Sequence, residues 1–208
     1  MDLSGKIALV TGASRGIGEA LAVGLAEHGT DIIICDLESE SRGLANTQKQ
    51  IEKTGKKCWS YFLDVTKKSQ IQKMVSDILS DIGSIDILVN NAGTNRPEQF
   101  TKIKKEDMNY VVDLNLKAAF HVAQMGAKAM IKLKNRKSVG GSIINISSQL
   151  GKVGAPNRSI YNMTKFGIEG LTRGMALDLA KNNIRVNTVC PTFVETPMVT
   201  KFFKDKKF

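Results

Sequence analysis

The stretch TGASRGIG, residues 11–18, stands between an apolar run and a helical pattern. The run KIALVT (6–11) predicts a strand, and the pattern that follows predicts a helix over 16–28. Closely spaced glycines at such a turn let a pyrophosphate approach the backbone N–H groups of the helix N-terminus. The glycine spacing is G-x-x-x-G-x-G, and the general dinucleotide fingerprint G-x-G-x-x-G is not met. The stretch therefore predicts a phosphate-binding loop, with a tight turn lacking any ligand as the alternative.

The rest of the chain repeats this alternation of strand and helix. Further Ile- and Val-rich runs predict strands over 31–36, 57–64, 86–90, 141–147 and 184–190. Helical patterns lie between them, over 39–54, 67–82, 105–134 and 160–181. The apolar runs are mostly continuous, which suits strands buried on both faces. Six strands with helical crossovers predict an α/β fold with a doubly wound parallel sheet. We expect one domain over 1–208, because the chain shows no linker, repeat or low-complexity segment.

The helical pattern over 105–134 predicts a single buried stripe. Apolar residues and one asparagine recur at i, i+3 and i+4 spacing, namely Met108, Val111, Val112, Asn115, Ala119, Val122 and Ala123. The polar member, Asn115, would be expensive to bury without a purpose.

Composition narrows the setting. The 208 residues are 42% hydrophobic and 24% charged, as in globular proteins. Cys35, Cys58 and Cys190 are widely spaced, so we expect neither a disulfide framework nor a metal site. The chain begins without a signal-peptide pattern and carries no apolar run of about 18 residues. We therefore expect a cytoplasmic protein with no membrane partner.

The net charge of +10 raises the question of acidic partners. Two stretches, 128–137 and 201–208, contribute heavily to it, and neither interleaves aromatic residues for stacking on bases. We expect solvated lysine-rich faces and no nucleic-acid partner. An acidic substrate or carrier stays open.

Asp36 closes the second predicted strand, 18 residues after Gly18. That is close to the roughly 20 residues at which an acidic side chain meets an adenosine ribose. A carboxylate there accepts hydrogen bonds from ribose hydroxyls and repels a 2′-phosphate, which favours NAD over NADP. Arg15 favours the opposite, since a guanidinium can pair with a 2′-phosphate, and Leu37 offers no second cation. The residues predict NAD and leave NADP possible; the alternative for Asp36 is a turn residue that ends a strand.

Seven motifs then occur in a fixed order: TGASRGIG, LDV (63–65), NNAG (90–93), DLNLK (113–117), ISS (146–148), YNMTK (161–165) and PTFVET (191–196). In this respect the chain resembles the short-chain dehydrogenase/reductase family over essentially its whole length. The resemblance implies an NAD(P)-dependent oxidoreductase with a Rossmann-type sheet in the order 3-2-1-4-5-6, usually followed by a seventh strand. It also implies a homodimer or homotetramer built on the helices 105–134 and 160–181, with Gly167, Gly170 and Gly174 allowing close approach.

The resemblance assigns roles to individual positions. It implies a catalytic tetrad of Asn115, Ser148, Tyr161 and Lys165, with Ser148 preferred to Ser147 because it precedes Tyr161 at the family spacing. Asp64 and Val65 would hold the adenine edge, and Val194 and Thr196 the nicotinamide carboxamide. The full set implied to bind cofactor is Gly12, Ser14, Arg15, Gly16, Ile17, Gly18, Asp36, Leu37, Asp64, Val65, Asn91, Ala92, Gly93, Tyr161, Lys165, Pro191, Val194 and Thr196.

These residue types suit alcohol oxidation and its reverse. A free tyrosine has a pKa of about 10, too high for a base near neutrality. The Lys165 ammonium, one turn along the same helix face, would lower the pKa of Tyr161. Ser148 would hydrogen-bond the substrate oxygen, and Asn115 would hold a water that links Lys165 to solvent. Each residue alone has a structural alternative. Ser148 could cap a turn, Asn115 could satisfy the backbone at a helix kink, and Tyr161 could be a core tyrosine with a solvated hydroxyl.

Two departures from the family pattern stand out. Thr192 replaces a usual glycine, which narrows the backbone choices there. The chain also ends at Phe208, so we expect a domain that is short at its C-terminus and lacks the last family strand.

The residues leave three functions open. The first is an NAD-dependent dehydrogenase of a sugar, polyol or sugar acid, with Arg96, Gln99, Gln149 and Arg158 in loops that could bind hydroxyls or a carboxylate; alternatively these are solvated positions. The second is a 3-oxoacyl-carrier-protein reductase that uses NADPH. The third is a cofactor-binding but inactive partner in an oligomer.

Overall fold

The computed structural model describes residues 2–132, 140–197 and 199–200. Its six strands form one parallel sheet in the order β3-β2-β1-β4-β5-β6. Their bounds are β1 Ile7–Thr11, β2 Asp31–Asp36, β3 Cys58–Phe62, β4 Ile87–Asn90, β5 Ser142–Ile146 and β6 Arg185–Val189. The predicted α/β class and the strand order are confirmed.

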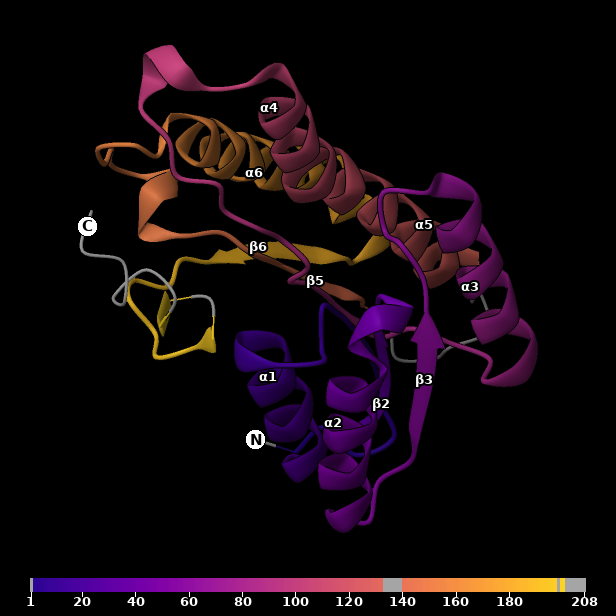
Figure 1. Ribbon diagram of the computed structural model, residues 1–208. Coiled ribbons are helices and arrows are strands. Elements are labelled where there is room, and N and C mark those ends of the chain that lie inside the picture. The colour runs from indigo at the N-terminus through magenta and orange to yellow at the C-terminus, as the bar shows by residue number, and fades with distance from the viewer. Residues whose placement is uncertain (1, 133–139, 198, 201–208) are drawn as a thin grey trace.

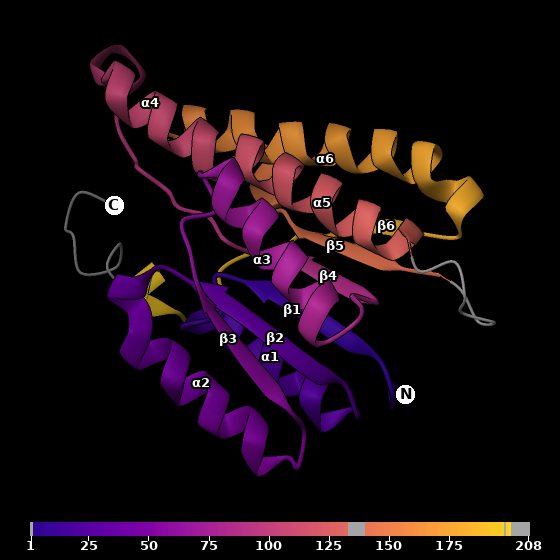
Figure 2. The ribbon, with the colours of Figure 1, turned by 90° about the vertical axis from the view of Figure 1, so that its right-hand side faces the viewer.

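Helices cover both faces of this sheet, as Figures 1 and 2 show. One face carries α1 and α2, and the other carries α3, α5 and α6, with α4 continuing past the strands. The bounds are α1 Gly16–Glu27, α2 Ser41–Lys53, α3 Lys68–Asp81, α4 Lys105–Val112, α5 Ala119–Lys132 and α6 Ser159–Leu179. Short 3-10 turns lie at η1 Glu38–Glu40, η2 Phe100–Lys102, η4 Gln149–Gly151 and η5 Ala180–Asn182.

The core lies in two layers because successive side chains of each strand point to opposite faces. Leu9, Ile33 and Leu88 pack under α3 and α5, and Val10 and Ile34 pack under α1 and α2. All five are at most 1% exposed. The central strands are therefore buried on both faces, as their continuous apolar runs predict.

Burial on both faces was a wrong expectation for the two edge strands. Phe62 at the end of β3 is 53% exposed, and Val189 at the end of β6 is 49% exposed. Each of these strands ends the described sheet and pairs on one side only. Their apolar character reflects partial cover by helices rather than burial in the middle of the sheet.

The single helix predicted over 105–134 is interrupted. A π-helical segment, η3 Asp113–Ala118, joins α4 to α5. Most of the predicted stripe is buried, namely Val111, Asn115, Ala119, Val122 and Ala123. The exceptions are Met108, which is 38% exposed, and Val112, which is half-buried; both lie in α4, before the π segment. Residues 133–134 of the prediction lie outside the described residues.

Two expectations concern the surface and the membrane. The basic stretches 133–137 and 201–208 lie outside the described residues. Within the part of the chain that the structure describes, no helix combines the length and hydropathy that crossing a bilayer takes.

Candidate active site

The carboxyl ends of the parallel strands bring the predicted site residues to one edge of the sheet. The loop after β1 lies between the ends of β2 and β4, and the loops after β5 and β6 follow on the same edge. In open α/β sheets this edge is where ligands bind, outside the strand ends at the point where strand order reverses.

The loop from Gly12 to Gly18 has a backbone that only glycine accepts. Gly12 and Gly16 have φ values of 65° and 61°, in the left-handed region. A Cβ on Gly18, the third residue of α1, would lie 2.1 Å from the Gly12 carbonyl oxygen. The first turn of α1 therefore packs against the loop with no room for a side chain. This is a cradle in which a pyrophosphate fits against the backbone N–H groups of the helix N-terminus.

Asn91 and Ala92 hold this loop from the end of β4. Asn91 Nδ2 donates to the carbonyl oxygens of Thr11 and Gly12, at 3.0 and 2.9 Å. The backbone N–H groups of Asn91 and Ala92 donate to Thr11 Oγ1, at 3.0 and 3.1 Å. Both residues thus fix the phosphate loop to the central strands, a task that the family motif alone did not indicate.

Asp36 faces the phosphate loop from the end of β2. One carboxylate oxygen accepts from Ser14 N at 3.1 Å, and the other accepts from Leu37 N at 2.9 Å. Arg15 points to the same region, where its guanidinium forms an ion pair with Glu40 of η1. The Arg15 guanidinium, which the sequence suggested as a partner for a 2′-phosphate, is therefore neutralised by the Glu40 carboxylate. This pairing joins residues 25 apart, and the sequence reading did not anticipate it.

Asp64 and Val65, which the resemblance assigns to the adenine edge, follow β3. The Asp64 carboxylate accepts from both the backbone N–H and the hydroxyl of Thr66, at 2.9 and 2.7 Å. Val65 is buried at 7% exposure in the same core as β2. The carboxylate thus orders its own turn. Ile17 packs into the other core layer.

The loop after β6 returns to the phosphate loop. A Cβ on Gly16 would lie 3.4 Å from Thr196 Cγ2, so Thr196 lies against that glycine. The Pro191 carbonyl accepts from Gln149 N at 2.9 Å, which joins this loop to the end of β5. Val194 is 41% exposed. Thr196 therefore borders the cradle, whereas Pro191 contacts η4 and Val194 is exposed.

Ser148 and Tyr161 meet where β5 and α6 approach each other. Ser148 caps η4, and its Oγ accepts from Leu150 N at 3.1 Å. Its hydroxyl also hydrogen-bonds with the Tyr161 hydroxyl, and this interaction lowers the pKa of Tyr161. The geometry supports the choice of Ser148 over Ser147.

Lys165 lies one turn beyond Tyr161 on α6. It is 6% exposed, and its Nζ is 5.4 Å from the centroid of the Tyr161 ring. The ammonium donates to the Ile146 carbonyl at 2.7 Å, at the end of β5. Burial lowers the pKa of Lys165 to about 8 despite the nearby Cys190, which raises it.

The expected effect of Lys165 on Tyr161 needs correction. Burial raises the pKa of Tyr161, and this outweighs the lowering by Ser148 and by the Arg158 guanidinium. The Lys165 ammonium is directed to a backbone carbonyl rather than to the phenol oxygen. The protein groups alone therefore hold the Tyr161 pKa above its usual value.

Asn115 lies in the π segment and is 3% exposed. Its Oδ1 accepts from Thr94 N at 2.8 Å, and its Nδ2 donates to the Thr94 carbonyl at 2.9 Å and to Thr164 Oγ1 at 3.2 Å. The side chain thus fixes the Gly93–Thr94 loop and the residue that precedes Lys165. Its expected role in holding a water near Lys165 stays a prediction.

The four proposed substrate residues differ in placement, and Gln99 lies at the start of η2. The Arg96 guanidinium pairs with Asp107 and stacks on Tyr110, 4.5 Å from the ring centroid. Gln149 lies in η4, next to Ser148. Arg158, at the start of α6, is close enough to Tyr161 to influence its pKa. Gln149 and Arg158 are therefore near the tetrad, whereas the charge of Arg96 is already matched on α4.

Comparisons with known proteins point to one family. The family model described as short chain dehydrogenase matches residues 6–207. A 3-oxoacyl-acyl-carrier-protein reductase of Thermotoga maritima is 41% identical over 201 residues, which cover 97% of this chain and 79% of that protein. The 5-keto-D-gluconate 5-reductase of Escherichia coli K12 is 36% identical over 100% of this chain and 79% of its own length.

A solved structure extends the likeness to three dimensions. Carveol dehydrogenase from Mycobacterium avium, in complex with NAD, superposes with a TM-score of 0.89 at 32% identity, over 95% of this chain and 74% of that chain. Fold, site and comparisons together define an NAD(P)-dependent oxidoreductase. The chain belongs to the short-chain dehydrogenase/reductase family.

Proposed function

We propose that this protein interconverts a secondary alcohol and a ketone, with NAD as cofactor and Tyr161 as the acid/base residue. The observation that carries the proposal is the contact of the Tyr161 and Ser148 hydroxyls beside Lys165, on the sheet edge that also bears the glycine cradle. The nicotinamide, when bound, accepts or supplies the hydride.

The side chains have distinct tasks in this proposal. Tyr161 takes the hydroxyl proton during oxidation and returns it during reduction. Ser148 hydrogen-bonds the same substrate oxygen and stabilises charge that develops on it. The positive charge of Arg158 favours the phenolate, and the positive charge of a bound oxidised nicotinamide would favour it further. This is needed because burial otherwise raises the Tyr161 pKa.

The cofactor preference rests on charge at the end of β2. Asp36 presents a carboxylate beside the loop, and Glu40 neutralises Arg15, so a 2′-phosphate would meet two acids and one matched cation. Ribose hydroxyls, by contrast, can donate to Asp36. Related solved structures hold either NAD or NADPH, so the preference rests on the charges of Asp36 and Glu40.

For the substrate we propose a sugar, polyol or sugar acid. Arg158 is close enough to Tyr161 to influence its pKa, and its guanidinium can bind a carboxylate of the substrate. Gln149 adds an amide beside Ser148 that can bind hydroxyls. The 36% identity to a 5-keto-D-gluconate reductase supports this class.

A second candidate is reduction of a 3-oxoacyl group on an acidic carrier protein. It is favoured by the 41% identity to the Thermotoga reductase and by the net charge of +10. The acids at Asp36 and Glu40 count against the NADPH that this candidate implies. A cofactor-binding but inactive partner is the third reading.

Two measurements separate these readings. Titration of NADH and NADPH, followed by nicotinamide fluorescence, should show tighter binding of NADH; tighter NADPH binding would overturn the cofactor proposal. Turnover should then appear with sugars, polyols or sugar acids and be absent with acetoacetyl thioesters. The reverse pattern identifies the carrier-protein reductase, and cofactor binding without any turnover identifies the inactive partner.

We also propose that α6 pairs with α6 of a second copy. Met163, Phe166, Gly170, Gly174 and Leu177 share one face of α6, and all five are exposed. A Cβ at Gly170 or Gly174 would meet nothing within 4 Å in this chain. A second helix can therefore approach this face closely.

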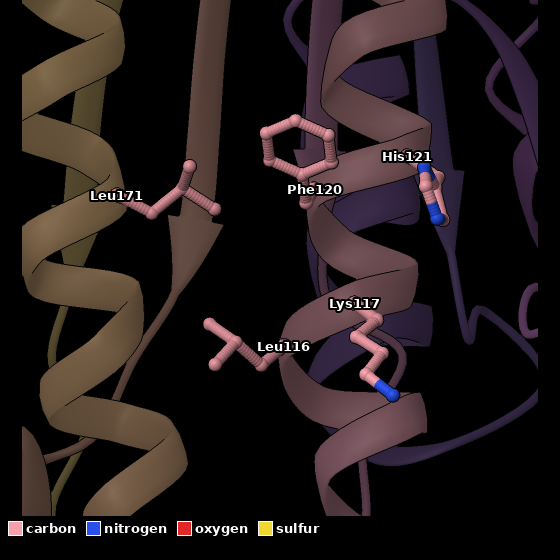
Figure 3. Close-up of a pocket in the computed structure, with 5 residues that line it drawn as sticks. All are labelled: Leu116, Lys117, Phe120, His121 and Leu171. Carbon is pink, nitrogen blue, oxygen red and sulfur yellow. The ribbon is translucent and has the colours of Figure 1, made fainter.

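A cavity adjoins this helix (Figure 3). It has a volume of about 270 Å³ and is lined by Leu116, Lys117, Phe120, His121 and Leu171. Leu171 of α6 points toward Leu116 and Phe120, while Lys117 and His121 lie on the other side of their helix. Gly167, by contrast, already packs on Leu116 of the same chain. The exposed face and the apolar side of the cavity suit a homodimer, or a homotetramer if a second such contact forms.

A further inference from the structure

A buried carboxylate that the proposed chemistry does not use lies beneath the tetrad. Glu169 stands one turn beyond Lys165 on α6 and is 5% exposed. Its Oε2 pairs with Lys152 Nζ and accepts from Thr188 Oγ1 at 3.4 Å, and its Oε1 accepts from Cys190 Sγ at 3.3 Å. Burying a charge is costly unless it is paired and hydrogen-bonded, and here both oxygens have partners.

The partners of Glu169 belong to the segments that carry the site. Lys152 follows η4, the turn that Ser148 caps. Thr188 lies on β6, and Cys190 directly precedes Pro191. Glu169 itself shares α6 with Tyr161 and Lys165. One carboxylate therefore joins all three segments that border the reacting groups.

These segments are in close contact around Gly151. A Cβ there would lie 2.7 Å from Ser147 Oγ, 3.0 Å from the Lys165 carbonyl and 3.2 Å from Glu169 Cγ. Packing this tight transmits a displacement instead of absorbing it. A change at Glu169 should thus move η4, and with it Ser148, relative to α6.

The charge state of Glu169 matches this arrangement. Burial alone would raise its pKa, but the Lys152 ammonium and the neighbouring hydroxyl and thiol groups lower it to about 2. The carboxylate is therefore ionised across the neutral range and keeps its ion pair.

We propose that Glu169 is a positioning residue that sets the contact between Ser148 and Tyr161 by joining α6 to η4 and the end of β6. The inference rests on the proposed roles of Ser148 and Tyr161. It assigns Glu169 no contact with substrate or cofactor.

The first test compares Glu169→Gln with Asp77→Asn. The control removes a carboxylate from an exposed ion pair with Lys73, on α3. We expect kcat to fall about tenfold or more in Glu169→Gln, because small misplacements of reacting groups are costly. KM and the NADH dissociation constant should stay within about twofold, and the control should match the wild type. An unchanged kcat in Glu169→Gln, at a temperature where it is folded, would overturn the inference.

The second test needs no substrate, so a wrong substrate assignment does not affect it. The ionisation of Tyr161 is followed by its phenolate absorbance as the pH is raised. Subtracting the absorbance of the same protein carrying Tyr161→Phe isolates this residue from the other tyrosines. Loss of the Ser148 contact raises the Tyr161 pKa, whereas loss of a nearby negative charge alone lowers it. We expect Glu169→Gln to shift the pKa of Tyr161 upward. A downward shift, or none, contradicts a positioning role.

A double-mutant cycle with Lys152→Met completes the design. Both single variants break the same ion pair, so their effects on kcat should not add. Additive effects would mean that Glu169 acts independently of η4. A failure of the proposed function itself has a different signature, namely full turnover in Tyr161→Phe.

Discussion

At the scale of the residue, the spacing of the motifs was enough to predict that Ser148, Tyr161 and Lys165 lie close together. Spacing of four along a helix places Tyr161 and Lys165 on one face whatever surrounds them. It could not reveal where the Lys165 ammonium points, because its acceptor, the Ile146 carbonyl, comes from another strand. Glu169 was missed although it continues the same face by another turn. Its partners, Lys152 and Cys190, were distant in sequence and had no motif of their own.

The buried Lys165 makes stability depend on pH. Its pKa is lowered in the folded protein from 10.5 to about 8. Between those values the unfolded chain holds a proton that the folded chain has released, so this group makes stability rise with pH across that window. Lys165→Met should remove the rise. Urea denaturation at several pH values between 8 and 10 measures it.

Lys73→Met is a suitable control, because the Lys73 side chain is exposed and its pKa is raised rather than lowered. The wild type and this control should show the same slope of unfolding free energy against pH. A slope that persists in Lys165→Met would mean that another group is responsible.

At the scale of the element, hydrophobic runs located all six strands and the helices between them. Boundaries moved by a few residues, for instance from 57–64 to Cys58–Phe62. The larger error was the unbroken helix over 105–134, because a π turn leaves no signature in residue spacing. Asn115 lies in that turn, and its bonds to Thr94 and Thr164 explain why a polar residue stands in an apolar stripe.

The exposed face of α6 is predicted to form the contact between two copies of the chain. Phe166→Glu places a charge in the proposed contact between copies, whereas Phe62→Glu alters an equally exposed phenylalanine on the edge strand β3. We expect the first variant to sediment as a monomer and the second to keep the wild-type mass. Sedimentation velocity distinguishes them. A wild-type monomer, or an oligomer unaffected by Phe166→Glu, would contradict pairing through α6.

At the scale of the whole molecule, the parallel sheet assembles the site from distant segments. The cradle after β1, Asp36 at the end of β2, Asn91 after β4 and Ser148 after β5 converge because the carboxyl ends of parallel strands share one edge. The fold class and the position of this edge therefore followed from the order of strands and helices alone. The choice of substrate could not be predicted from this order, because it depends on the conformation of the loops that carry Arg96 and Arg158 at that edge. The structure pairs Arg96 with Asp107 and places Arg158 close enough to Tyr161 to influence its pKa.

The central claim is that Tyr161 moves the proton in the proposed alcohol oxidation. Tyr161→Phe removes only the hydroxyl, so NADH binding should remain near that of the wild type. The turnover of wild type and variant, measured with the best alcohol at saturating NAD, tests this most directly. We predict that kcat falls by about 10²–10⁴-fold in the variant. A Tyr161→Phe protein that binds NADH and turns over at the wild-type rate would contradict the account.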